Sequence, residues 1–61
     1  MKQYYLNPQI GKVRYPLSIY DGKATHKDGS HFWGMACISN KRNLKRKIRE
    51  LMAEGYVEGK P

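Results

Sequence analysis

The chain has 61 residues, with 12 lysines and arginines against 5 acidic residues, and its formal net charge is +7 at neutral pH. A chain of this size forms one small domain and can bury only about 60% of the surface that its unfolded state exposes. Its single cysteine excludes an intramolecular disulfide, and no stretch reaches the roughly 20 apolar residues that span a bilayer. We therefore expect a cytoplasmic domain, without a membrane partner, whose charge favours polyanions such as nucleic acid.

The first third of the chain predicts extended structure. Residues 1–9 contain two adjacent tyrosines and a turn-prone Asn7-Pro8 pair, which leaves an edge strand and an arm as alternatives. In residues 12–20 polar and apolar side chains alternate, which predicts a half-buried strand. Because Pro16 lacks an amide hydrogen, we expect this strand either to lie at the margin of its sheet or to have one side unpaired at Pro16. An open strand edge of this kind would also allow a homodimer.

The middle of the chain predicts a turn-rich connection and a second strand. Residues 21–30 contain two Asp-Gly pairs, so they form either one long loop or a hairpin that projects from the domain, with its tight turn at Asp28-Gly29. Residues 31–39, HFWGMACIS, are apolar on both faces and predict a buried central strand. We expect Trp33, Met35 and Cys37 to face the helix, because the side chains on their face of the strand have the larger total volume.

The segment from Asn40 to Gly55 predicts the helix around which the domain is organised. Asn40 is a favoured N-cap residue, and Gly55 is suited to the left-handed conformation that ends a helix. The spacing of four apolar residues predicts the stripe that faces the core: Leu44, Ile48, Leu51 and Met52. A third short strand at 56–58 then completes an α+β fold in which a small antiparallel sheet packs on one helix, in the order β-β-α-β. The folded body would span 10–58, with a frayed tail at 59–61.

Charge provides the clearest functional indication. Six lysines and arginines fall between positions 41 and 49, more than solubility requires. We therefore expect non-catalytic binding of DNA or RNA, because lysine and arginine displace counterions from phosphates. The expected contacts are Lys41, Arg42, Lys45, Arg46 and Arg49, with additional phosphate contacts from Lys23, Lys27 and Arg14. The alternative is a protein-binding module, such as a phage inhibitor or adaptor, which docks an acidic host protein by this helix or by an open strand edge.

Catalysis, cofactors and metals find little support in the sequence. The spacing of His26, His31, Asp21, Asp28 and Cys37 fits no established zinc pattern. Cys37 lies in an apolar segment, where a free cysteine usually packs as a small hydrophobe rather than as a reactive thiolate. No glycine-rich phosphate loop is present either. We therefore expect a protein that is not an enzyme.

Part of the chain resembles a known group of proteins. The strings IYDGKATHKDGSHF and NKRNLKRKIRELMAEGYV resemble those of small uncharacterised proteins from bacteriophages and prophages, in which an Asp-Gly turn and a Thr-His-Lys-Asp-Gly-Ser stretch precede a strand and a helix ending in Gly-Tyr. Residues 1–18 lie outside this likeness. It implies a mobile-element setting in a bacterial cytoplasm and no particular mechanism.

A looser likeness concerns the turn and the strand that follows it. Lys27, Asp28, Gly29, Phe32 and Trp33 are similar to a pattern in the arm-binding domains of phage integrases and in plant AP2-type domains. In those domains a three-stranded sheet, backed by one helix, reads the DNA major groove. They supply all three strands before the helix, whereas this sequence must draw the third from its N-terminal arm or from 56–58.

Overall fold

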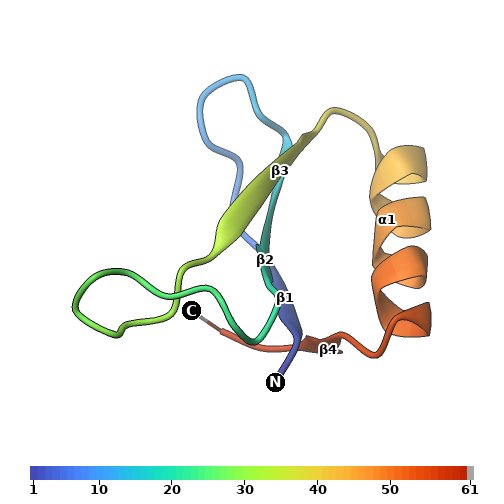
Figure 1. Ribbon diagram of the computed structural model, residues 1–61. Coiled ribbons are helices and arrows are strands. Elements are labelled where there is room, and N and C mark those ends of the chain that lie inside the picture. Colours follow the sequence, from blue (N-terminus) through green and yellow to red (C-terminus); the bar gives the residue numbers. More distant parts are fainter. Residues whose placement is uncertain (61) are drawn as a thin grey trace.

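The computed structural model describes residues 1–60, which form one helix and four strands. The strands are β1 (Gln3–Leu6), β2 (Tyr15–Tyr20), β3 (Gly34–Ile38) and β4 (Val57–Glu58), and the helix is α1 (Lys41–Ala53). The strand order in the sheet is β3-β2-β1-β4, with β4 parallel to β1 and the other neighbours antiparallel. The helix lies against one face of this sheet (Figure 1). The predicted α+β class is confirmed, although the sheet is mixed rather than purely antiparallel.

The N-terminal segment forms an inner strand, so both predicted alternatives, an edge strand and an arm, were wrong. β1 pairs with β2 on one side and with β4 on the other, so three strands precede the helix. At the C-terminal end, the predicted short strand is present, and the backbone N–H of Gly59 extends its pairing by donating to Tyr4 O at 2.9 Å. Of the tail expected at 59–61, Pro61 lies outside the described residues.

β2 is an inner strand, so the first alternative for Pro16, a place at the sheet margin, was wrong. Pro16 instead lies just beyond the point where the pairing with β1 ends, in agreement with the second alternative. The carbonyl of Pro16 accepts from the backbone N–H of Asn7 at 2.9 Å, and Asn7 lies one residue beyond the end of β1. Because the nitrogen and oxygen of one strand residue point to the same side, the ring nitrogen of Pro16 faces the end of β1. The missing donor therefore leaves the pairing within β1 and β2 intact.

The hydrophobic core lies between α1 and the two inner strands. Its buried members are Tyr4, Leu17, Leu44 and Leu51, and six partly buried residues pack around them: Tyr15, Ile19, Ala36, Ile38, Ile48 and Tyr56. The opposite face of β2 is also buried, at Pro16, Ser18 and Tyr20. There the Ser18 hydroxyl accepts a hydrogen bond from Asn7 Nδ2 at 2.7 Å.

β3 is an edge strand, and its faces are the reverse of those expected. It pairs with β2 alone, and its register sets Ala36 opposite Leu17 and Ile38 opposite Tyr15, on the core side. Met35 and Cys37 consequently lie on the other face, where Met35 is 55% exposed and Cys37 is exposed too. The predicted central position was wrong because β3 lies at the end of the sheet. The predicted burial of the Cys37 thiol was wrong because Ala36 and Ile38 take the core side of the strand.

The ends of α1 are those that the sequence predicts. The side-chain oxygen of Asn40 accepts from the backbone N–H of Asn43 at 2.8 Å. At the other end Gly55 has a φ of 93°, and the N–H of Tyr56 donates to Leu51 O at 2.9 Å, a Schellman closure.

The apolar stripe of α1 differs from the predicted one at a single position. Met52 is 60% exposed, because it lies about 80° around the helix from Leu44, outside the part of the helix surface that contacts the core. Ile48, at about 40° by the same rotation, still packs against the core.

Residues 21–33 form a projecting hairpin rather than an irregular loop (Figure 1). Thr25 pairs with His31, and the N–H of His26 donates to Ser30 O at 2.8 Å. Gly29 has a φ of 89°, a conformation that side chains rarely adopt, and its N–H donates to His26 O at 3.0 Å. This is the three-residue turn with a glycine bulge that an Asp-Gly pair favours.

Candidate nucleic-acid interface

Four cationic side chains gather on the face of α1 that points away from the sheet. With about 100° of rotation per residue, positions 42, 45, 46 and 49 fall within an arc of about 100° opposite Leu44. The structure places these side chains around one shallow hollow of about 320 Å³, lined by Arg42, Lys45, Arg46 and Arg49. We call these four residues the outer face of α1. They are four of the five helix residues expected to contact phosphate.

The outer face is self-repelling. Arg42 lies three and four positions before Lys45 and Arg46, and Arg49 follows these two at the same spacings. Like charges at these spacings destabilise a helix by about 0.2–0.5 kcal/mol a pair. Among residues 1–60, the side-chain hydrogen bond made by an outer-face cation is that of Arg46 Nη2 to Asn43 Oδ1, at 3.2 Å, and this acceptor is neutral. The charge on this face is therefore not used for intramolecular bonding to carboxylates.

The charge is also concentrated at the wrong end of the helix for stability. The first turn carries Lys41 and Arg42 and no acidic residue, whereas the last turn carries no basic residue. Helix dipoles favour anions at the N-terminus and cations at the C-terminus, by about 0.3–1 kcal/mol for each exposed charge. The arrangement thus costs stability and creates a site at which an external anion is attracted by the helix end and by its cations together.

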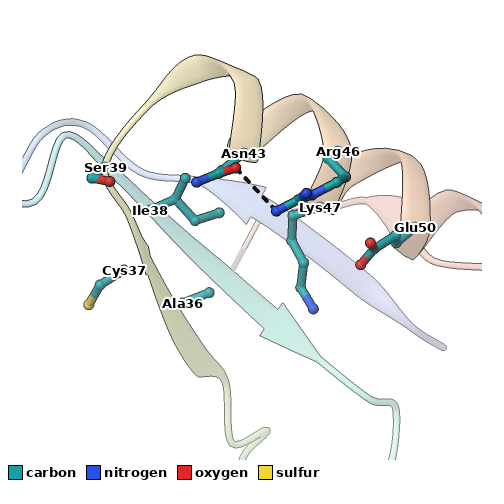
Figure 2. Close-up of a pocket in the computed structure, with 8 residues that line it drawn as sticks. All are labelled: Ala36, Cys37, Ile38, Ser39, Asn43, Arg46, Lys47 and Glu50. Carbon is teal, nitrogen blue, oxygen red and sulfur yellow. Dashed lines mark hydrogen bonds between the residues drawn. The ribbon is translucent and has the colours of Figure 1, made fainter.

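The two remaining helix cations lie beside the outer face. Lys41 is exposed in the first turn. Lys47 is half-buried and lines the space between α1 and β3, where Figure 2 shows it extending away from the helix. Lys47 therefore belongs to the space beside β3, which Arg46 of the outer face also lines.

The structure does not join Lys23, Lys27 and Arg14 to the helix cations. Lys23 and Lys27 are exposed on the 21–33 hairpin, and Arg14 is exposed just before β2. In Figure 1 the hairpin and the 7–14 loop lie on the side of the sheet away from α1. A single ligand on the outer face therefore lies across the sheet from these three side chains.

The hairpin also carries its own neutralising charges. Hydrogen bonds from the backbone N–H groups of Ala24 and Lys23 lower the pKa of the Asp21 carboxyl. The hydroxyl of Ser30, followed by its backbone N–H, lowers the pKa of Asp28. The charges of two ionised aspartates therefore balance those of two lysines, and the formal charge of this hairpin is zero. It is a weak phosphate site compared with the helix.

Sequence reasoning missed an aromatic cluster at the base of the hairpin. The ring of Tyr20 stacks on His31, with centroids 4.4 Å apart and planes 12° apart, and lies 5.5 Å from the ring of Trp33. The alternation of side chains along β2 places Tyr20 on the face opposite the core residues Leu17 and Ile19, and this could have indicated the cluster. A large aromatic side chain on that face of an inner strand is expected to be covered by other side chains. The cluster fills the sheet face opposite α1 beside β2.

Two other kinds of feature, a metal-ligand cluster and a membrane-spanning helix, can be checked in the part of the chain that the structure describes. Within residues 1–60 there is no cluster of three potential metal ligands, and no helix has the length and apolar character needed to cross a lipid bilayer. Comparisons with protein-family models, curated proteins and solved structures each found no match for this chain.

Proposed function

We propose that this protein binds nucleic acid, without catalysis, through the outer face of α1. The observation that carries the proposal is the convergence of Arg42, Lys45, Arg46 and Arg49 on one hollow of a helix that they destabilise. Side chains that repel one another gain stability when phosphates lie between them, because each contact releases condensed counterions and relieves the repulsion. The same charges on a helix used only for packing would have no such compensation.

The helix is a better candidate than the sheet for contact with nucleic acid. The sheet face opposite α1 is buried along β2, where Pro16, Ser18 and Tyr20 are covered. The edge of that face at β3 presents Met35 and Cys37, which carry no charge. A sheet that enters the major groove requires an open polar face, so the looser likeness to sheet-reading DNA-binding domains does not extend to this surface.

A salt series on duplex DNA tests the proposal. Four phosphate contacts predict that the logarithm of the binding constant falls with the logarithm of salt concentration with a slope of about −3.6, and about −2.8 for a single strand. Fluorescence anisotropy with a labelled 20-base-pair duplex, the matching single strand and an RNA hairpin at low salt would measure these slopes. Arg42→Gln combined with Lys45→Gln is expected to reduce the duplex slope by about 1.8.

A matched variant separates site binding from net charge. Lys12→Gln combined with Lys60→Gln removes the same two charges from exposed positions outside the outer face. This control is expected to leave the slope close to that of the unchanged protein. Equal losses in both double variants would show that only the overall charge matters, and an absence of binding to all three nucleic acids would overturn the proposal.

A further inference from the structure

A second surface of the molecule has the features of a peptide-binding edge. β3 ends the sheet on one side, and within residues 1–60 no other strand covers its outer edge. Its five residues, Gly34–Ile38, include no charged residue and no proline, which are two of the devices with which proteins block an exposed edge. The edge is therefore open to pairing.

The register identifies the backbone groups that face outward. Pro16 faces β1, because its carbonyl accepts from Asn7, so the next residue, Leu17, faces β3. Leu17 pairs with Ala36, whose backbone groups consequently point to β2. The alternate residues Met35 and Cys37 then present their N–H and C=O groups to the open edge. These are the groups that an added strand would bond.

A groove runs beside this edge, between β3 and α1. It has a volume of about 360 Å³ and is lined by Ala36, Cys37, Ile38, Ser39, Asn43, Arg46, Lys47 and Glu50 (Figure 2). The strand supplies its apolar side, and the helix supplies two cations against one carboxylate, Glu50. The groove therefore combines an unpaired backbone with a positive wall.

We propose that β3 accepts an extended acidic peptide as an added strand, with carboxylates in the groove. Peptide residues opposite Met35 and Cys37 share the face of these two side chains and are apolar. The residues between them point toward α1, where a carboxylate meets Arg46 and Lys47. The strand pairing provides backbone hydrogen bonds, and the two cations select acidic side chains.

Charge distinguishes this partner from a second copy of the chain. A second copy carries another seven positive charges, and its own β3, Gly-Met-Ala-Cys-Ile, offers no carboxylate to the groove. Pairing two β3 strands would thus leave Arg46 and Lys47 without an acidic partner. An acidic peptide satisfies the backbone and these side chains together.

The test uses three synthetic peptides and the isotopically labelled full chain, observed by NMR. The peptide (Glu-Val)4 is expected to shift the β3 amide signals and to slow hydrogen exchange at Met35 and Cys37. The peptide (Lys-Val)4 reverses the charge. The peptide (Glu-Pro)4 keeps the charge but removes the N–H groups of the residues opposite Met35 and Cys37, which in antiparallel pairing are the ones that bond β3. Both are expected to bind at least about tenfold more weakly, because they lose the attraction or the bonded pairing.

Variants of the protein provide an independent check. Cys37→Pro removes one outward N–H without affecting a donor that faces β2, and is expected to weaken (Glu-Val)4 binding by about 2- to 10-fold. Lys47→Gln is expected to weaken it too, whereas Lys12→Gln, which removes a charge distant from the groove, is not. Because the peptide comparison uses the unaltered chain, it remains decisive if Cys37→Pro fails to fold.

Three outcomes would overturn the proposal. Equal binding of (Glu-Val)4 and (Glu-Pro)4 would mean that no strand is added. If the amides of Met35 and Cys37 become more protected from hydrogen exchange as protein concentration rises, in the absence of peptide, the edge would be assigned to a second copy of the chain. Larger β3 shifts with an oligothymidine eight-mer than with (Glu-Val)4 would assign the groove to nucleic acid.

Discussion

Two aspartates show how single side chains fix the 21–33 hairpin. Asp21 accepts from the backbone N–H groups of Lys23 and Ala24, at 2.8 and 2.9 Å, and Asp28 accepts from the backbone and the hydroxyl of Ser30. Each carboxylate bonds to groups that follow it by two or three positions, which is the local behaviour that places aspartate in turns. These hydrogen bonds stabilise the ionised form of both carboxyl groups.

The lowered pKa of Asp21 predicts a pH dependence of stability. Its folded-state pKa lies below the ordinary value of 3.8, so the unfolded chain binds more protons in acid. Its contribution to stability is therefore present above pH 3.8 and is lost as the pH falls through the folded-state pKa. Asp21→Asn retains a side-chain acceptor but cannot titrate, so its unfolding free energy is expected to fall less between pH 5 and pH 2. Urea unfolding at several pH values measures this, and parallel curves for both proteins would contradict it.

At the scale of the element, α1 combines strong local signals with an unfavourable charge pattern. Its N-cap and its glycine-terminated end are each made by residues within a few positions of one another, so the sequence alone is enough to place both. The cations of its first turn oppose the helix dipole, and those of the outer face repel one another. Stability and the proposed function therefore place opposite demands on the same positions.

This conflict can be tested at Arg42. Arg42→Glu is expected to raise the unfolding free energy by about 0.3–1 kcal/mol, because a carboxylate in the first turn suits the helix dipole and relieves repulsion with Lys45. The same change is expected to weaken duplex binding. Thermal unfolding and fluorescence anisotropy on one sample measure the two effects. For Arg42→Gln, both the stability and the duplex affinity are expected to lie between those of the unchanged protein and of Arg42→Glu. A loss of stability in Arg42→Glu would show that the outer face contributes to the fold.

Local signals explain which elements could be predicted from the sequence. The helix and its caps depend on neighbours in the chain, and they were predicted correctly. The turn at Asp28-Gly29 is equally local, and it was one of the two alternatives predicted for residues 21–30. The place of each strand in the sheet depends on distant pairing. Pro16 is tolerated in an inner strand because β1 stops just short of it, and nothing in residues 12–20 indicates where β1 ends.

The same distinction applies to the candidate sites. The gathering of four cations on the outer face follows from helical rotation, which the sequence fixes. The separation of Lys23, Lys27 and Arg14 from them depends on which side of the sheet each loop takes. The edge position of β3 could not be predicted, because residues 31–39 are apolar enough for a central strand. Part of this apolar character belongs to His31 and Trp33, which precede β3 and pack beside Tyr20.

At the scale of the whole molecule, the fold is a thin plate. Its Cα atoms extend 34 × 28 × 13 Å, and five hydrophobic residues are buried among residues 1–60: Tyr4, Leu17, Tyr20, Leu44 and Leu51. A core this small leaves little stability in reserve. Each buried side chain therefore contributes a large share of the total.

Adjacent residues of α1 provide a paired test of this thin core. Leu51 is 3% exposed and Met52 is 60% exposed. Leu51→Ala is expected to cost about 2–5 kcal/mol and to leave most of the chain unfolded at room temperature, because it removes packing and opens a cavity. Met52→Ala is expected to change stability by less than about 0.5 kcal/mol. Circular dichroism with urea titration measures both, and similar losses at the two positions would contradict the placement of the helix.

The parallel pairing of β1 with β4 has a mechanical consequence. The N–H of Val57 donates to Lys2 O at 3.1 Å, and that of Gly59 donates to Tyr4 O at 2.9 Å. If the chain is held at residues 2 and 59 and stretched, the load acts along both strands and across these bonds, which must then rupture together rather than peel one after another. Tension applied between positions 2 and 33 bypasses this clamp, so the molecule should yield at a lower force in that direction.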